Sequence, residues 1–282
     1  MAGEEDVLHI QSWLKSQPHL PPISDKQVKL FLHSCLLHLE ETKKTIDTYY
    51  TLKTNTPEFF SSRNPLSDEI QHIKNVIQLA VLPKKSPEGY TMIVGRLKDP
   101  DPSHYVYTST VKLLFMVVDA ILQTEGPLSG LVYVFDMQGG TLSHVTKANL
   151  SSVRKYFTYS QEGMPVRLKA IHIVNVNPVI THIMNLAKQF MSKERIKMIH
   201  LHTGITDEFL QAVPRSLLPR DYTGDEPLLD DLFKDTLRLL EDCKHWFMQD
   251  EKLKVDESKR ERGHSSTEEF GVAGSFKKLE ID

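Results

Sequence analysis

The hydrophobic positions divide the chain into a helical first part and a mixed second part. From Val7 to about Ile77, apolar residues recur at helical spacing, and runs of β-branched residues are missing. Ser24, followed three residues later by Gln27, has the pattern of a capping box that starts a helix. We therefore expect a helical N-terminal lobe over residues 1–82.

Beyond Leu82 the pattern changes to short β-branched runs that alternate with helical stretches. This alternation is typical of an α/β fold, in which each crossover is long enough to make neighbouring strands parallel. Strands are expected at Tyr90 to Leu97, Leu131 to Asp136, Ala170 to Val176 and Ile196 to His202. Helices are expected at Ser109 to Gln123, Ser143 to Tyr159, Pro178 to Phe190 and Thr206 to Val213. The pattern predicts a mostly parallel α/β domain over residues 83–224.

The last part of the chain, residues 225–282, carries mixed signals. Leu228 to Trp246 has Leu and Phe at helical spacing, which predicts a helix that packs back on the body. Glu251 to Glu269 is charged and polar enough to favour disorder, whereas the final FGVAGSFKKLEID regains alternating apolar residues. We expect a C-terminal helix, a charged linker and a docking tail.

Composition narrows the class of protein. The chain has 282 residues with 40% hydrophobic and 25% charged positions, and its formal net charge of -3 provides no excess positive charge for a nucleic-acid partner. Cys35 and Cys243 are too few for a disulfide framework or a four-cysteine zinc site. The acidic start MAGEED lacks a secretory signal, and no apolar run approaches the roughly 20 residues that span a bilayer. We expect a cytoplasmic protein with transient peripheral membrane contact.

The sequence offers little that indicates catalysis. The nucleophile-elbow, phosphate-loop and HExxH patterns are missing. His200 and His202 would share a strand face, but no Cys, Asp or Glu accompanies them at ligand spacing, so we favour structural histidines over a metal site. Asp136 ends a strand, yet Ser143 and His144 downstream have no recognisable triad order, so a turn-capping role is favoured. We expect neither an enzyme nor a metal site.

Periodicity does indicate two apolar surfaces in the α/β part. Period two places Leu131, Tyr133 and Phe135 on one face of their strand, and Ile171 and Ile173 on one face of theirs. Period 3.6 forms a stripe on the following helix from Val179, Ile183, Leu186 and Phe190, with Ile180 beside it. A filled core and an apolar cavity would both produce this pattern.

Several segments resemble the CRAL-TRIO family, the lipid-exchange fold shared by tocopherol transfer and retinaldehyde-binding proteins. The resemblance rests on ISDKQVKLFLHSCLLHLEETKKTIDTYYTLKTNTPEFF, VYVFDMQGGTLSHV, RLKAIHIVNVNPVITHIMNLAKQFMS, IKMIHLHT and LLPRDYTGD, in the order and spacing of the family. It covers nearly the whole chain. The tail FGVAGSFKKLEID is similar to a C-terminal signature of insect members.

The resemblance implies a parallel sheet that forms the floor of a deep apolar pocket, closed by a mobile gate helix. By position the gate is Pro178 to Met191. The implied ligand contacts are Val117, Leu131, Tyr133, Phe135, Tyr159, Ser160, Ile171, Ile173, Val179, Ile180, Ile183, Leu186 and Phe190. Polar selectivity contacts are expected among Tyr133, Tyr159, Ser160, His172 and Asn175. No cofactor is expected beyond a bound hydrophobic lipid.

Several members of the family also bind membrane phosphoinositides through a basic cleft. Leu30, His33 and Cys35 stand where the family typically carries arginines, which weakens this implication. The basic residues that remain are Arg167 and Lys169, at matching positions, and Lys193, Arg195 and Lys197, which cluster without matching register. These five charges fit either a phosphate-headgroup site or an ordinary solvated rim.

The expected function is the non-enzymatic binding and intermembrane transfer of a small hydrophobic lipid, such as a tocopherol, retinoid, carotenoid or similar isoprenoid. The expected partners are that lipid and a membrane surface, possible phosphoinositides included, but no nucleic acid. The alternative is a phosphoinositide-responsive adaptor in membrane traffic. The missing arginines argue against the adaptor, whereas the tail after Lys254 offers it a segment for a protein partner.

Overall fold

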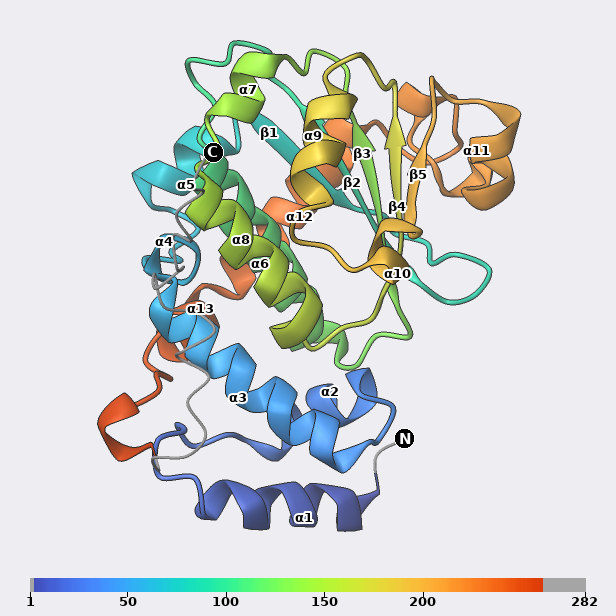
Figure 1. The fold of residues 1–282 in the computed structure, drawn as a ribbon. Helices are drawn as coiled ribbons and strands as arrows, with labels where there is room; N and C mark the ends of the chain where they lie inside the picture. The colour runs from blue at the N-terminus through green and yellow to red at the C-terminus, as the bar shows by residue number, and fades with distance from the viewer. Residues whose placement is uncertain (1–2, 261–282) are drawn as a thin grey trace, which may run out of the picture.

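The computed structural model describes residues 3–260, so the predicted docking tail, residues 270–282, lies outside the described residues. The N-terminal part consists of the helices α1 (Glu4–Lys15), α2 (Asp25–Ser34), α3 (Leu39–Asn55), α4 (Pro57–Phe60) and α5 (Asp68–Ile73) (Figure 1). The predicted capping box is confirmed at the start of α2. Ser24 Oγ accepts a hydrogen bond from the Gln27 amide, and the Ser24 amide donates to Gln27 Oε1 at 3.1 Å.

A five-stranded sheet follows in the order β1 (Ile77–Val81), β2 (Thr91–Leu97), β3 (Leu131–Asp136), β4 (Leu168–Val174) and β5 (Ile199–Leu201). Strands β2 to β5 pair in parallel, as the long crossovers predict. Strand β1 pairs antiparallel to β2. It corrects the expectation of helical structure up to residue 82, because the five-residue run IQLAV is too short for periodicity to separate a buried strand from a helix.

The crossovers place most helices on one side of the sheet. Helix α6 (Tyr107–Glu125) precedes β3, α7 (Leu142–Thr146) and α8 (Leu150–Thr158) precede β4, and α9 (Ile180–Ala187) and α10 (Lys193–Ile196) precede β5. A single helix was predicted from Ser143 to Tyr159. The chain instead forms two helices, because Asn149 Oδ1 accepts the Ser152 amide at 2.8 Å and starts a new helix. A π-helical turn, Tyr159–Gly163, ends this crossover.

The strand register confirms the predicted apolar face. Tyr133 pairs with Ile171 and Phe135 with Ile173, so these side chains share one face. Figure 1 shows α9 in front of the sheet and α12 (Leu229–Asp242) behind it. The opposite face is covered by the chain from α11 (Asp207–Ala212) onward, where the fully buried Phe209 packs edge-on against His172 with ring centres 5.8 Å apart.

A buried cluster of four charges ties the N-terminal helices to the rest of the chain. Arg63 donates to Asp119 on α6 at 2.6 Å. Arg63 and Lys53 of α3 both contact one oxygen of Asp250, at the end of α13 (Lys244–Asp250). Burial alone would raise the pKa of Asp250, but Lys53 and Arg63 hold it below its usual range. Two cations and two anions therefore compensate one another inside the protein.

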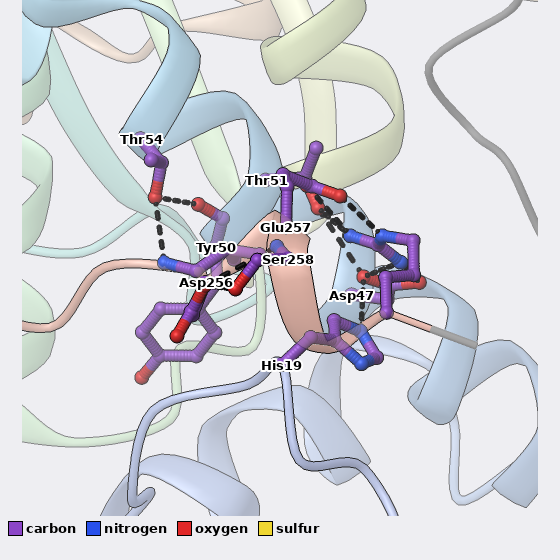
Figure 2. A network of polar contacts seen from close by, with 10 residues as sticks. His19, Asp47, Tyr50, Thr51, Thr54, Asp256, Glu257 and Ser258 are labelled. Atoms are coloured by element: carbon purple, nitrogen blue, oxygen red, sulfur yellow. Dashed lines mark hydrogen bonds and ion pairs between the residues drawn. The ribbon is translucent and has the colours of Figure 1, made fainter. Parts of the chain in front are cut away.

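The chain after α13, residues 251–260, returns to the N-terminal helices and is called the strap below (Figure 2). The Asp256 amide donates to the carbonyl of His19 at 2.9 Å. Arg260 donates to both carboxylate oxygens of Asp47 on α3, at 2.9 and 2.8 Å. Disorder predicted from Glu251 onward is therefore wrong for residues 251–260, because Arg260 pairs with Asp47 and the Val255 amide donates to Thr54, both on α3 and far away in the sequence.

Candidate functional site: an apolar cavity between the sheet and helix α9

An apolar cavity of about 370 Å³ lies between the front face of the sheet and the helices that cover it. This volume falls within the range of about 300–1,000 Å³ that is typical of small-molecule sites. The sheet contributes Leu79, Phe135, Ile171, Ile173 and Ile199. The remaining walls come from α6 and the segment before it, from α7 with the segment that leads to α8, from α8, and from α9 with Met191 beyond it.

The floor of the apolar cavity depends on Gly95. This residue lies between Leu79 and Phe135 in the register of β1, β2 and β3. A Cβ atom at Gly95 would lie 2.8 Å from Phe135 Cδ1 and 2.9 Å from Leu79 Cδ2, which is closer than real contacts. The missing side chain therefore leaves room for the Phe135 ring to lie across the sheet and border the cavity.

Helix α9 meets this cavity instead of a packed core. Ile183, Met184, Leu186 and Ala187 line the cavity, yet Ala187 is the one buried residue of the helix. The other three side chains are half-buried, because their apolar atoms face the cavity. An apolar helix face without a packed partner needs another group to cover it.

The chain that follows α9 is anchored through Gln161 of the π-helical turn. Gln161 Nε2 donates to the carbonyl of Phe190 at 2.9 Å, and Gln161 Oε1 accepts the Ser192 amide at 3.3 Å. Phe190 also stacks on Phe157 of α8, with ring centres 6.1 Å apart. The C-terminal end of α9 is thus held to the neighbouring crossover.

The structure places five of the thirteen predicted ligand contacts at the apolar cavity. These are Phe135, Ile171, Ile173, Ile183 and Leu186. The other eight lie outside its lining: Val117, Leu131, Tyr133 and Tyr159 are buried in the packed core, Ser160 borders a different pocket, and Val179, Ile180 and Phe190 flank the cavity-facing part of α9. The sheet floor at the cavity therefore consists of the outer end of β3 and of residues on β1, β4 and β5, but not of Leu131 and Tyr133.

Packing explains why the inner end of the same face is closed. Phe115 and Tyr159 lie 4.6 Å apart between ring centres, and Tyr156 stacks on Phe115 at 5.8 Å. Burial, with a smaller contribution from Tyr156, raises the pKa of Tyr133 well above its usual value. Leu131 has no exposed surface. Aromatic side chains from α6 and α8 fill the space that the resemblance assigned to ligand.

Other lining residues were not singled out by the sequence pattern. Tyr107, Val111 and Leu114 lie on one side of α6 at spacings of four and three residues, a signal that could have found them. His144, considered before only as a triad partner, lines the apolar cavity as well. The polar candidates His172 and Asn175 do not belong to the lining.

A second, basic pocket of about 330 Å³ lies between the α2–α3 turn, the π-helical turn and α10. Arg167, Lys169 and Arg195 line it, whereas Lys193 and Lys197 are exposed outside it. Within residues 3–260, none of these five cations forms an ion pair. Arg195 donates to the carbonyl of Gln161 at 3.2 Å, and burial lowers its pKa. Two carboxylates, Glu41 and Glu162, also border this basic pocket.

The residues considered for catalysis do not assemble. Asp136 accepts hydrogen bonds from the Tyr222 hydroxyl at 3.0 Å and from Asn175 Nδ2 at 2.8 Å. It borders a separate polar pocket, while His144 lies at the apolar cavity. His172 Nδ1 and His202 Nε2 lie 3.1 Å apart, but the described part of the chain holds no group of three or more potential ligands that could bind a metal ion. Among the helices of residues 3–260, none is long and apolar enough to cross a membrane.

Comparisons with known proteins agree with this architecture. Residues 2–70 match a family model described as Pinta-like, UBA domain, and residues 76–224 match the CRAL/TRIO domain. The chain is 26% identical over 218 residues to the alpha-tocopherol transfer protein-like protein of Mus musculus, covering 77% of this chain and 63% of the relative. It therefore spans less than two thirds of that relative's length. Clavesin-2 of Rattus norvegicus is 20% identical over 229 residues, covering 80% of this chain and 70% of the relative.

A solved structure shares the fold. The crystal structure of Sfh5 superimposes with a TM-score of 0.52 at 13% sequence identity, over 74% of this chain and 75% of that chain. The CRAL/TRIO match alone covers more than half of the 282 residues, and it includes the whole sheet and every helix that borders the apolar cavity. The chain therefore belongs to the CRAL/TRIO domain family.

Proposed function

We propose that this protein is a non-enzymatic carrier that binds one small hydrophobic lipid in the apolar cavity and transfers it between membranes. The observation that carries the proposal is the 370 Å³ cavity, which is bordered almost entirely by apolar side chains and closed on one side by α9. The proposed ligand class is that of tocopherols, retinoids, carotenoids and similar isoprenoids. The mouse relative, which is described as alpha-tocopherol transfer protein-like, supports this class.

The energetics favour an occupant. The lining leaves apolar side chains of the sheet and α9 without a packed partner. Covering such side chains with a guest removes their apolar surface from water. Enclosing about 400 Å² of apolar ligand surface favours binding by about 10 kcal/mol before ordering costs. A lipid guest therefore buries apolar surface that the chain alone leaves uncovered.

Helix α9 is the proposed gate, within the segment Pro178 to Met191. Its outer side carries the exposed Thr181, His182 and Asn185, while its inner side faces the cavity. Opening in water would expose Ile183 and Leu186, whereas opening at a bilayer would bury them in lipid. A membrane surface therefore favours the open state without ATP, because it binds that state better.

Native mass spectrometry of the purified protein tests the carrier directly. We expect a retained lipid whose mass falls in the isoprenoid range. Ile171→Trp fills the cavity from its floor and is expected to abolish loading, whereas Leu8→Trp adds the same side chain at an exposed position of α1 and leaves loading unchanged. Full loading of folded Ile171→Trp protein would contradict the proposal.

Hydrogen exchange tests the gate separately. We expect faster amide exchange from Pro178 to Met191 in lipid-free protein than in loaded protein, because the ligand supplies the packing that holds α9. Equal exchange of this segment in both states would count against a gating role, while leaving the binding site itself intact.

The basic pocket favours a second, membrane-directed role. Its cations form no ion pairs with any residue from 3 to 260. The adjacent turn exposes Leu36 and Leu37, at 60% and 40% of their surfaces, with left-handed φ angles of 53° and 65°. Such a turn can enter a lipid surface while the cations contact anionic headgroups. Membrane docking serves the carrier, and it serves equally the alternative function of a phosphoinositide-responsive adaptor.

Vesicle binding tests the headgroup preference. We expect tighter binding to phosphatidylcholine vesicles that contain phosphatidylinositol bisphosphate than to phosphatidylcholine alone. The double variant Arg167→Gln/Lys169→Gln should lose most of this gain, whereas Lys254→Gln, an exposed control on the strap, should keep it. Binding that is indifferent to phosphoinositide content removes the headgroup proposal and with it the adaptor alternative.

A further inference from the structure

The apolar cavity is bordered by one histidine whose protonation can be worked out from its contacts. His144 is only 8% exposed and occupies the third position of α7. The Thr141 amide donates to His144 Nδ1 at 3.2 Å, and the Thr141 hydroxyl lies 2.8 Å from the same atom. A ring nitrogen that accepts from an N–H group carries no proton, so the proton of the neutral ring is on Nε2.

This Nε2–H group has no hydrogen-bond partner in the described residues. Eight buried side-chain polar atoms of residues 3–260 share that condition, and His144 Nε2 is the one among them that belongs to a residue lining the apolar cavity. Buried donors in proteins are nearly always bonded, and an exception indicates a missing partner. Since the unpartnered donor borders the cavity in which a guest would lie, the guest can supply that partner.

The surroundings keep His144 neutral and in place. Burial lowers the pKa of His144, while Asp101 and Asp99 act weakly in the opposite direction. The ring packs edge-on against Tyr105 at 5.3 Å between ring centres. Thr110, another polar residue of the lining, already donates its hydroxyl to the carbonyl of Val106 at 3.0 Å. His144 therefore offers an oriented, uncharged donor in a wall whose other polar side chains carry hydroxyl groups: Tyr105, Tyr107, Thr110 and Tyr156.

We propose that His144 Nε2–H donates a hydrogen bond to an uncharged oxygen of the bound lipid. The inference rests on the proposed carrier function and specifies its ligand class: an apolar body with an alcohol, aldehyde, ketone or ester oxygen at the α7 end of the cavity. Among the described residues that line the cavity there is no Lys or Arg, so a carboxylate would be buried without a countercharge. Pure hydrocarbons leave the donor unpaired, and fatty acids bring an uncompensated charge.

Three lipids with one carbon skeleton test this specificity: phytol, phytane and phytanic acid carry an alcohol, no polar group and a carboxylate. Lipid-free protein is incubated with vesicles that contain all three in equal amounts, and native mass spectrometry measures the loaded fractions. We expect wild type to load phytol in preference to both others. His144→Phe should lower the phytol-to-phytane ratio about three- to tenfold relative to wild type, because one hydrogen bond is lost. Phytane loading should persist.

Control variants separate the donor from neighbouring effects. His9→Phe makes the same substitution at an exposed position of α1, far from the cavity, and should keep the wild-type ratio. Tyr107→Phe removes the hydroxyl of another lining residue and shows whether that group, instead of His144, selects the lipid. An unchanged ratio in folded His144→Phe protein overturns the proposal, and so does a loss of selectivity in Tyr107→Phe alone. If wild type loads all three lipids without preference, the role proposed for His144 is contradicted but the carrier function is not. If wild type loads none of them, both proposals are contradicted.

A second measurement covers the case in which His144→Phe fails to fold. In ¹⁵N-labelled wild-type protein, the His144 ring nitrogens should show the Nε2–H tautomer in the lipid-free state. Phytol should then shift the Nε2 resonance, whereas phytane should leave it in place. An Nδ1–H tautomer, or identical shifts with both lipids, would overturn the assignment.

Discussion

The two ends of one sheet face differ although their sequences follow the same pattern. Leu131 and Tyr133, at the inner end of β3, are 0% and 4% exposed and lie under packed side chains. Phe135, at the outer end of β3, and Ile171, which lies opposite Tyr133 on β4, are half-buried because they border the apolar cavity. Alternation assigns all of these residues to the same face. Whether the face is filled depends on the helices that cover it.

The covering helices differ in side-chain volume. At the inner end, α6 and α8 supply aromatic rings, and Phe60 from α4 adds a ring stacked on Phe115 at 5.4 Å. At the outer end, α9 approaches with Ile183, Leu186 and Ala187, which do not reach the sheet closely enough to fill the space. The comparison indicates that a binding cavity in this fold arises where a crossover lacks the rings that fill it elsewhere.

The largest expected effect is a difference in folding stability between two ring deletions, one in the packed part of the sheet face and one at the cavity. Phe115→Ala removes a fully packed ring and should lower the free energy of unfolding by about 3–5 kcal/mol. Phe135→Ala should cost less, about 1–2 kcal/mol, because part of its surface already faces the cavity. Urea unfolding of both lipid-free variants measures the difference, and equal losses would contradict the contrast between the two ends.

The opposite face of the sheet is packed as well, and there the packing should make the folding stability depend on pH. His172 is buried against Phe209, His200 and His202. The pKa of His172 falls from 6.5 to about 4, because of burial first and of the two neighbouring histidines second. Glu208 of α11 raises the pKa of the neighbouring His202, although burial lowers it overall. The unfolded state therefore binds more protons between these values, so stability is full above pH 6.5 and is lost as the pH falls toward 4.

The loss expected from His172 amounts to about 2 kcal/mol between pH 7 and pH 4.5, because solvent screens part of the effect of burial. Urea unfolding from pH 7 to pH 4.5 measures it. His172→Phe keeps the packing against Phe209 and removes the titrating group, so its stability should depend less on pH than that of wild type. The same pH dependence in both proteins would show that His172 is not the group responsible.

Tryptophan insertions sharpen the contrast further. Leu131→Trp adds volume where packing is complete and should destabilise the protein by about 1–3 kcal/mol, with lipid loading lost only as far as folding is lost. Ile171→Trp, two residue pairs further along the face, should leave stability within about 1 kcal/mol of wild type while loading disappears. Thermal unfolding and native mass spectrometry report the two effects. A stable, loaded Leu131→Trp variant would indicate that the inner end is open.

The smallest expected effect concerns the glycine under the cavity floor. Gly95→Ala places a methyl group against Phe135 and should cost about 1–2 kcal/mol, while pushing the ring into the cavity and weakening lipid loading. Gly204→Ala is the matched control, because the nearest atom to its added methyl group is Asn175 Oδ1 at 3.7 Å. The pair can be compared by urea unfolding. Equal stability and equal loading of the two variants would remove Gly95 from the account of the cavity.

Sequence patterns predicted much of the fold where the structure depends on interactions between residues close together in the chain. The capping box at Ser24, the parallel strands and the shared face of Tyr133 and Ile171 all follow from spacing within one element or from crossover length. Predictions were wrong where a distant partner decided the outcome. Strand β1 forms because β2 is available to pair with it, and the strap around Arg260 is ordered because Asp47 lies opposite.

The sequence by itself determined which residues are apolar, which face of each strand they share and which segment becomes the helix over the sheet. Only the tertiary structure decided where that face is covered by rings and where it borders a cavity, because Leu131 and Ile171 look alike in a pattern of alternation. It also decided the role of His144. A donor becomes a candidate ligand contact only when its other ring nitrogen is engaged and a cavity lies beside it, and both conditions are set by groups brought together in folding.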